Sequence, residues 1–346
     1  MTRIGFLGAG FIARYHAHNL GLCREANEVV AVYDPAVHRR EKFAAWQRCD
    51  AVDSLEAVLD ASDAVFVCTW TSEHAPQVAA AASRGLAIFC EKPLAVDLAT
   101  AGRMVEAVAS AGVIHMVGLV LRTSPAFLAL REMLADPAVG RPMSVVFRDD
   151  QYIPTQGQYR STWRGERDKV GSGTLLEHSI HDLDIIEWLL GPVTSVSAHT
   201  SHFHELDGIE DAASVVARFA GGHTATMASV WHDVLARPSQ RRVEIFCERA
   251  LLTLEGDEAG PIHWQRDDSS GTLEGDALLD WLRARGVDLE LAEDAFLRAV
   301  RTGGPAPAPT FVDALRAHVV ADAIYRSAQS GGAAVVLDPS HPLPAG

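Results

Sequence analysis

Residues 3–13 read RIGFLGAGFIA and decide the fold of the first part of the chain. An apolar run leads into Gly8 and Gly10, and a small residue follows three places later, which matches the pattern G-x-G-x-x-G/A between a strand and a helix. Gly8 suits a tight turn, and Gly10 lets the backbone come close to a pyrophosphate. Phe11 and Ile12 open the helix, whose N-terminal amides favour phosphate. The stretch therefore predicts a dinucleotide-binding unit.

The acid expected at the end of the second strand is Asp34, which follows the apolar run 29–33. A carboxylate at this place can accept hydrogen bonds from ribose hydroxyls and would repel a 2'-phosphate, so we expect NAD, with NADP less favoured. His38, Arg39 and Arg40 follow closely and weaken this preference. An ordinary loop carboxylate is the alternative interpretation of Asp34.

Strand-like runs alternate with helical patterns over residues 1–122, which predicts a doubly wound parallel sheet in an α/β Rossmann domain that binds the cofactor. Residues 123–346 carry consecutive strand-like runs, the last of them over residues 242–254, with a hairpin signal at Gly221-Gly222, and predict an α+β domain with a large, mostly antiparallel sheet. We expect helices over residues 173–190 and 310–327. Because one face of such a sheet would expose apolar side chains, we expect a homodimer or homotetramer through it.

The composition excludes some classes of partner. The chain has 346 residues, with 30 Lys and Arg against 45 Asp and Glu, and a formal net charge of -15, which disfavours nucleic acid and anionic membranes. No run reaches the roughly 18 apolar residues of a membrane span. The start of the sequence lacks the pattern of a secretory leader, and the five cysteines include no CxxC pair. We therefore expect a cytoplasmic protein with reduced thiols.

Glu91-Lys92-Pro93 follows the strand-like run 87–90, at the carboxyl edge of the predicted parallel sheet. Open α/β folds place their ligands at this edge. Lys92 could donate hydrogen bonds to a substrate hydroxyl, and Pro93 could fix the turn, with a cis bond as one way to do so. A solvated loop lysine is the alternative.

A second group of polar residues lies in the segment 171–184, which predicts a glycine turn entering a helix. Glu177, His181 and Asp184 are spaced i, i+4 and i+7 and so share one helix face. His181 is our candidate general base, because the ordinary pKa of histidine lies nearest neutrality. Asp184 either orients His181 or has a structural role. His178, His181 and Asp184 lack a fourth ligand, and we predict no metal.

An ordered set of motifs in both halves resembles the glucose-fructose oxidoreductase and inositol dehydrogenase family, often called Gfo/Idh/MocA. The set comprises Gly8 to Ala13, Asp34, the segment from Cys68 to His74, Glu91-Lys92-Pro93, Arg122, Pro125, Trp163-Arg164, the segment from Gly173 to Asp184 and the closing helix. It covers nearly the whole chain. The resemblance implies hydride transfer between nicotinamide C4 and a secondary alcohol or ketone of a sugar, cyclitol or related polyol, without a metal.

The resemblance also implies three catalytic groups around the reacting hydroxyl. Lys92 corresponds to the family's lysine and His181 to its histidine. The family usually has an aspartate four residues before that histidine, and this chain has Glu177, which is one methylene longer. The role of Glu177 is therefore open.

Further cofactor contacts are implied by the turn after the predicted strand 64–68. Thr69, Trp70 and His74 belong to this turn, and Glu91 and Lys92 to the next one. Trp70 replaces a proline of the family, and either stacks near the nicotinamide or substrate, or packs at the domain junction. His74 is expected to be structural, with a cofactor contact as a further role.

The expected substrate is small and polyhydroxylated, and needs many directed hydrogen bonds. Besides Lys92 and His181, the expected substrate contacts are Arg122, Gln151, Tyr152, Trp163, Arg164 and His178. Exposed loops favour the same residue types for solubility alone.

Two other functions stay open at this stage. The same fold serves glycosidases that retain NAD, and non-catalytic proteins that sense NAD. The presence of both Lys92 and His181 argues against a pure sensor.

Overall fold

The computed structural model describes residues 1–157 and 160–339, and the chain forms two compact units. The first unit comprises Met1–Leu119 and Glu290–Leu315, and the second comprises Val120–Leu289 and Arg316–Gly346. The sequence analysis did not assign the segment 290–315 to the first unit.

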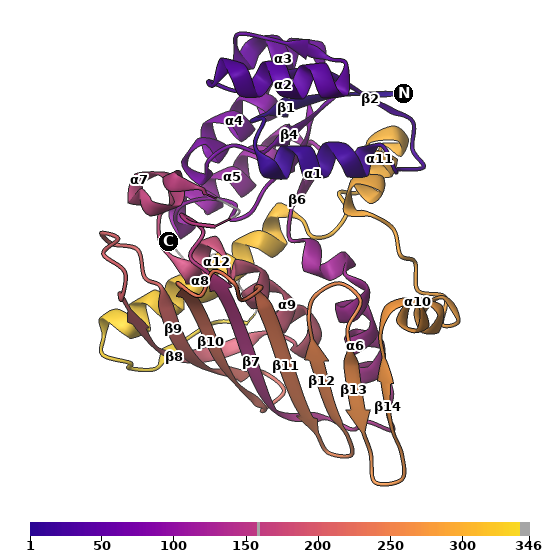
Figure 1. The fold of residues 1–346 in the computed structure, drawn as a ribbon, viewed down its shortest axis with the longest axis vertical. Helices are drawn as coiled ribbons and strands as arrows, with labels where there is room; N and C mark the ends of the chain where they lie inside the picture. Colours follow the sequence, from indigo (N-terminus) through magenta and orange to yellow (C-terminus); the bar gives the residue numbers. More distant parts are fainter. Residues whose placement is uncertain (158–159, 340–346) are drawn as a thin grey trace. The chain divides into compact units, whose positions relative to one another are not determined.

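The first unit contains a sheet of six parallel strands in the order β3-β2-β1-β4-β5-β6 (Figure 1). The strands are β1 (Thr2–Leu7), β2 (Asn27–Tyr33), β3 (Asp50–Ala51), β4 (Ala64–Val67), β5 (Ala87–Cys90) and β6 (His115–Val117). The helices are α1 (Phe11–Leu20), α2 (Val37–Gln47), α3 (Leu55–Ala61), α4 (Thr71–Ser83), α5 (Leu98–Ala111) and α11 (Ala292–Thr302). The predicted doubly wound parallel sheet is confirmed.

Aromatic side chains form the centre of the first unit's core. β4 and β5 are apolar and fully buried along their length, as expected for parallel strands covered on both faces. The rings of Phe66 and Phe89 stack with centroids 4.7 Å apart. Phe296 of α11 meets both rings edge-on at 5.7 Å. This contact explains why a segment so late in the sequence belongs to the first unit.

The second unit contains a sheet of nine strands in the order β14-β13-β12-β11-β7-β10-β9-β8-β15. The strands are β7 (Pro142–Tyr152), β8 (Val193–Ser201), β9 (Ala212–Phe219), β10 (Thr224–His232), β11 (Gln240–Cys247), β12 (Leu251–Glu255), β13 (Ile262–Gln265), β14 (Ser270–Leu273) and β15 (Val335–Val336). β7 and β10 pair in parallel, and the other neighbours pair antiparallel. The predicted mostly antiparallel sheet is confirmed.

Short helical elements connect these strands. They are η1 (Val120–Thr123), α6 (Pro125–Ala135), η2 (Thr162–Gly165), α7 (Arg167–Val170), α8 (Thr174–Glu177), α9 (Ile180–Leu190) and α10 (Gly275–Arg283). The closing helix α12 (Phe311–Gln329) begins in the first unit and continues into the second. Among the helices of the described residues, none combines the length and apolar character needed to cross a membrane. The cytoplasmic location stays a prediction.

Two expected elements are each divided in the structure. The run 242–254 forms a hairpin instead of one strand, because Cys247 N–H bonds to the carbonyl of Ala250 and turns the chain. The expected helix over residues 173–190 breaks between α8 and α9. At this break Ser179 is fully buried, and its hydroxyl bonds to Ser229 at 2.6 Å. A continuous helix face from Glu177 to Asp184 was therefore a wrong expectation.

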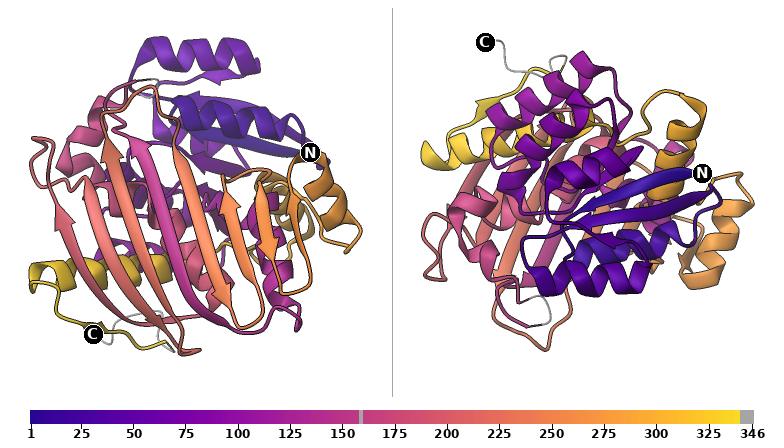
Figure 2. Two further views of the ribbon diagram at one scale, coloured as in Figure 1. Left: turned by 60° about the horizontal axis from the view of Figure 1, so that its bottom comes forward. Right: turned by 90° about the horizontal axis from the view of Figure 1, so that it is seen from above.

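The two faces of the nine-stranded sheet differ. Along β7, β9, β10 and β11, buried side chains alternate with exposed or half-buried ones. The left view of Figure 2 shows the broad face of this sheet with no helix of the second unit in front of it. The opposite face carries the core and the polar side chains described below.

Candidate functional site

The loop after β1 has the geometry expected of a phosphate-binding turn. Gly8 has a φ of +95°, and a Cβ at this position would lie 2.5 Å from the carbonyl oxygen of Cys68. Only glycine fits there. At Gly10 a Cβ would meet nothing within 4 Å, so the space in front of the loop is open for a ligand. Phe11, which begins α1, is exposed, and Ile12 is half-buried.

Asp34 lies directly after β2, as the sequence predicts, and is buried against the same loop. Its Oδ2 accepts a hydrogen bond of 2.9 Å from Ala9 N–H, and its Oδ1 accepts one of 2.8 Å from Ala36 N–H. The carboxylate therefore holds the phosphate loop in shape. A carboxylate oxygen can accept more than one hydrogen bond, so this arrangement is compatible with a ribose contact.

Glu91 belongs to a buried cluster that the sequence analysis missed. His16 of α1 is fully buried, with Nε2 2.7 Å from Glu91 Oε1 and Nδ1 2.6 Å from Glu293 Oε1. Asn19 also donates to Glu293, at 3.0 Å. Burial by itself lowers the pKa of His16, but the hydrogen bonds and charges of Glu293 and Glu91 raise it to about 9. His16 is thus a buried cation between two acids.

The other residues expected near the cofactor lie at the ends of β4 and β5. Thr69 and Trp70 are half-buried, and Thr69 donates to the side chain of Gln77 at 2.9 Å. His74 is buried, and its Nδ1 donates to the carbonyl of Pro93 at 3.0 Å. Lys92 is half-buried, and the Lys92-Pro93 peptide bond is cis. The first unit thus gathers these side chains around the carboxyl ends of two neighbouring strands.

In the second unit, two of the expected site residues form ion pairs with arginines. Glu177 is 2% exposed, and its Oε1 accepts a hydrogen bond of 2.8 Å from Arg164 Nε. The Arg164 guanidinium also lies 4.8 Å from the Trp163 ring centroid. Arg122 holds buried Asp184 through two bonds, Nε to Oδ2 at 2.9 Å and Nη2 to Oδ1 at 2.5 Å. These pairs anchor η2 to α8 and η1 to α9.

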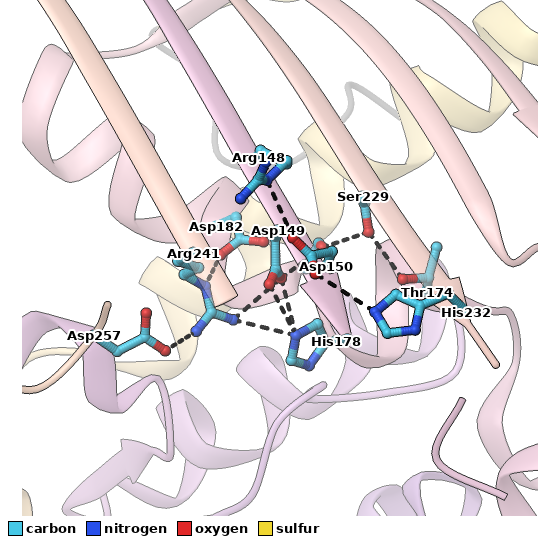
Figure 3. A network of polar contacts seen from close by, with 11 residues as sticks. Arg148, Asp149, Asp150, Thr174, His178, Asp182, Ser229, His232, Arg241 and Asp257 are labelled. Atoms are coloured by element: carbon cyan, nitrogen blue, oxygen red, sulfur yellow. Dashed lines mark hydrogen bonds and ion pairs between the residues drawn. The ribbon is translucent and has the colours of Figure 1, made fainter. Parts of the chain in front are cut away.

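A row of polar side chains crosses the buried face of the sheet on three neighbouring strands, as Figure 3 shows. Arg241 of β11 is paired in register with Asp149 of β7, which is paired with Ser229 of β10. All three are buried, and we call them the polar row. His178 and Asp182 contact it from the helical segment, with His178 Nε2 2.9 Å from Asp149 Oδ2 and Asp182 Oδ1 2.5 Å from Arg241 Nε.

The two aspartates at the polar row differ in pKa. Burial raises the pKa of Asp149, but the charge of Arg241 and the hydrogen bond from His178 outweigh it and leave the pKa well below its ordinary value. Burial raises the pKa of Asp182 well above its ordinary value, and the negative charge of Asp149 adds to this. At neutral pH Asp149 is therefore ionised, and Asp182 holds its proton to a higher pH than an ordinary aspartate.

The remaining expected residues lie close by in the second unit. His181 is half-buried in the first turn of α9. Gln151 and Tyr152 are buried at the end of β7. Within residues 1–157 and 160–339, no three His, Cys, Asp or Glu side chains gather as a metal site.

Comparison with known proteins identifies the family. Residues 2–119 match the model of the oxidoreductase family with an NAD-binding Rossmann fold, Gfo/Idh/MocA, and residues 127–253 match the Gfo/Idh/MocA C-terminal domain. The chain is 31% identical over 346 residues to an inositol 2-dehydrogenase of Cereibacter sphaeroides strain ATCC 17029, which covers 96% of this chain and 95% of the relative. The chain belongs to the Gfo/Idh/MocA family.

Two further similarities agree with membership of the Gfo/Idh/MocA family. The chain is 32% identical to a 1,5-anhydro-D-fructose reductase of Ensifer adhaerens over 228 residues, 64% of this chain and 67% of the relative. The WlbA dehydrogenase of Bordetella pertussis, solved with NADH and UDP-GlcNAcA, has the same fold, with a TM-score of 0.83 over 97% of this chain and 98% of that one at 22% identity. The chain is an NAD(H)-binding oxidoreductase, and the predicted dehydrogenase class is confirmed. The roles of single residues stay predictions.

The sequence analysis missed Glu210, a buried residue of this Gfo/Idh/MocA protein that holds the start of α8 in place. A Cβ on Gly173 would lie 1.8 Å from the carbonyl oxygen of Glu210, so only glycine fits at the N-cap of α8. The Glu210 carboxylate accepts hydrogen bonds from Gly173 N–H at 2.8 Å and Leu175 N–H at 3.0 Å. It also accepts one from the Tyr325 hydroxyl at 2.9 Å. No sequence signal beyond the glycine itself indicates this partner.

Proposed function

We propose that the chain oxidises a secondary alcohol of a sugar, cyclitol or related polyol, or reduces the corresponding ketone, with NAD as the hydride carrier. The relatives named above, an inositol 2-dehydrogenase and a 1,5-anhydro-D-fructose reductase, support this class of substrate. The observation that carries the proposal is the α8–α9 segment, where half-buried His178 and His181 lie next to fully buried acidic groups. Such a segment can bind hydroxyls and move a proton.

In this proposal His181 takes the proton of the reacting hydroxyl. An imidazole suits this step because its ordinary pKa lies near neutrality. Burial raises the pKa of the neighbouring Asp182 well above its ordinary value, which disfavours a negative charge beside His181. Asp184 is held by two bonds from Arg122, which favours a positioning role for Asp184 in α9 over a direct one.

Lys92 would donate a hydrogen bond to the same substrate oxygen and stabilise its negative charge as the proton leaves. The longer side chain of Glu177 reaches Arg164, so we propose that this ion pair, with Trp163, forms part of the substrate wall. Gln151, Tyr152, Arg122 and His178 are the other proposed substrate contacts. A guanidinium, an amide and an imidazole can each bind hydroxyls.

The proposed cofactor residues lie in the first unit. They are Gly8, Gly10, Phe11, Ile12, Asp34, Thr69, Trp70, His74, Glu91 and Lys92. When bound, NAD supplies the hydride acceptor at C4 of its nicotinamide. The open space at Gly10 fits the approach of a pyrophosphate, and the Asp34 carboxylate favours NAD over NADP because it would repel a 2'-phosphate.

Replacement of the two proposed catalytic residues tests this function. Lys92→Ala and His181→Ala should each lower turnover of the best polyol by roughly 100- to 10,000-fold, because each removes a group that acts on the reacting oxygen. NADH affinity, measured by fluorescence, should change only a few-fold. Lys42→Ala and His263→Ala, on α2 and β13, are matched controls and should keep full activity. Wild-type turnover in both site variants would contradict the proposal.

We further propose that copies of the chain associate through the exposed face of the nine-stranded sheet. Val216 is in register with Thr226, and Thr226 with Val146, so these residues form a row across three strands on one face. Val146, Val216 and Phe246 are exposed. Monomeric proteins seldom expose a broad apolar face, which supports a homodimer or homotetramer.

A further inference from the structure

His178 lies in the break between α8 and α9, three residues before His181. Its side chain is 17% exposed, whereas the Asp149 carboxylate that it contacts is 1% exposed. Nε2 of His178 lies 2.9 Å from Asp149 Oδ2 and 3.5 Å from Arg241 Nη2. Within residues 1–157 and 160–339, Nδ1 forms no hydrogen bond. The ring thus meets the polar row through Nε2 alone among the described residues.

The charge of Asp149 decides the direction of the bond to His178. An ionised carboxylate can only accept, so His178 Nε2 carries the hydrogen and donates it to Asp149. Arg241 is itself a donor, and its contact with Nε2 is the longer of the two. A neutral imidazole with its hydrogen on Nε2 has a lone pair on Nδ1.

The polar row does not need His178 for its own stability. Asp149 already accepts hydrogen bonds from Arg241 and from the Ser179 hydroxyl, each at 3.2 Å. Arg241 compensates its charge, and the same guanidinium also donates to Asp182 and Asp257 (Figure 3). The row is therefore a complete, rigid support that fixes the ring of His178, in the way that outer carboxylates fix functional histidines elsewhere.

We propose that His178 is a specificity-determining residue, whose Nδ1 accepts a hydrogen bond from a substrate hydroxyl other than the one that is oxidised. Asp149 and Arg241 are its positioning residues. The proposal rests on the proposed function, because it requires a substrate with more than one hydroxyl. A fixed, half-exposed acceptor discriminates strongly, since an analogue that lacks the matching hydroxyl leaves the acceptor unpaired.

The first test is the tautomer of His178. Nitrogen-15 NMR at pH 8, with the signal assigned by its loss in His178→Leu, should show the hydrogen on Nε2. In Asp149→Asn, which is close in shape and can donate to Nε2, the population with the hydrogen on Nδ1 should rise. A wild-type ring with its hydrogen on Nδ1, or an unchanged tautomer in Asp149→Asn, would overturn the proposal. This test needs no turnover.

The second test is kinetic. The probes are myo-inositol, scyllo-inositol, D-apiose and 1,5-anhydro-D-fructose, followed by monodeoxy analogues of the best one. His178→Leu should raise KM roughly 10- to 100-fold, the usual effect of losing such a hydrogen bond, with kcat and NADH affinity changed only a few-fold. One deoxy analogue should show the same loss with the wild type and no further loss with the variant.

His263→Leu is the matched control, because it makes the same replacement on β13, outside the polar row and the α8–α9 segment. Its KM should stay within about two-fold of the wild type. An unchanged KM in His178→Leu, in an enzyme whose wild type turns over a probe, overturns this inference and leaves the proposed function intact. If the wild type turns over none of the probes, the proposed function fails and the inference fails with it.

Discussion

The buried His16 cluster predicts an unusual dependence of stability on pH. The pKa of His16 is about 9 in the folded protein, against an ordinary value of 6.5, and this rise corresponds to about 3 kcal/mol of stabilisation. Because the folded pKa is the higher one, the stabilisation is fully present below pH 6.5 and is lost as the pH rises through 9. His16→Gln, which is neutral at every pH, removes it and leaves Glu91 and Glu293 without their shared cation.

We expect His16→Gln to be less stable than the wild type by about 3 kcal/mol at pH 6, and this difference to shrink towards zero by about pH 10. Urea unfolding followed by circular dichroism measures the difference, and hydrogen exchange in α1 assigns the transition of the first unit. Burial lowers the pKa of His115, so His115 destabilises the folded state as the pH falls below 6.5. This effect is the same in the wild type and in His16→Gln.

Asn19→Ala is the control, because it removes the 3.0 Å hydrogen bond to Glu293 without removing a titrating group. It should lower stability by about 1 kcal/mol at every pH. Parallel stability curves for the wild type and His16→Gln between pH 6 and 10 would refute the assignment of a buried cation.

Three further predictions concern the cofactor loop and the sheet face. Gly8→Ala should lower the free energy of unfolding by about 1–3 kcal/mol, because its Cβ would strike a backbone carbonyl. Gly10→Ala should unfold like the wild type yet bind NADH at least 10-fold more weakly. Equal effects of the two variants in melting and fluorescence assays would contradict this prediction. Asp34→Ala should weaken NADH binding roughly 10-fold and raise the ratio of NADPH to NADH affinity, and an unchanged ratio would remove Asp34 from cofactor choice. Val216→Arg should lower the mass seen in analytical ultracentrifugation, and an unchanged mass would exclude this face as the interface.

The fold of the first unit was predictable because its signals are local. The glycine pattern, the acid after the second strand and the apolar runs each lie within a few residues of the element that they specify. The exception is α11, whose attachment depends on contacts across the chain. His16 in α1 resembles any helix histidine in sequence, and its partner Glu293 lies 277 residues away. No short-range pattern can indicate such a pair.

The helix expected over residues 173–190 shows a different limit. Its spacing of apolar residues is helical throughout, and the prediction followed that pattern. The break depends on Ser179, whose hydroxyl finds two buried partners on the sheet, Asp149 and Ser229. A serine that bonds outward to the sheet competes with the helix only when that sheet is present. The sequence therefore identified residues 173–190 as part of the site but did not predict the break between α8 and α9.

The polar row carries a signal that sequence reasoning could have used. On β11, Arg241 lies on the same inward-facing side as Val243 and Ile245. On β7, Asp149 lies on the inward-facing side after Phe147. A charged side chain among inward-facing apolar residues must form an ion pair, because burying the charge alone costs several kcal/mol. The alternation alone thus predicts that each of these charges has a buried partner of opposite sign.

Identifying that partner requires the strand register, which pairs Arg241 with Asp149, 92 residues away in the sequence. It also needs the helix that brings Asp182 to the same guanidinium. Which acid has the raised pKa then follows from position, because Asp182 is completely buried beside an acid that is already ionised. Sequence can therefore predict that the buried face of this sheet holds compensated charge. Only the folded arrangement shows that the ionised acid in contact with His178 is Asp149. The proposed hydrogen bond from a substrate hydroxyl to His178 depends on that charge.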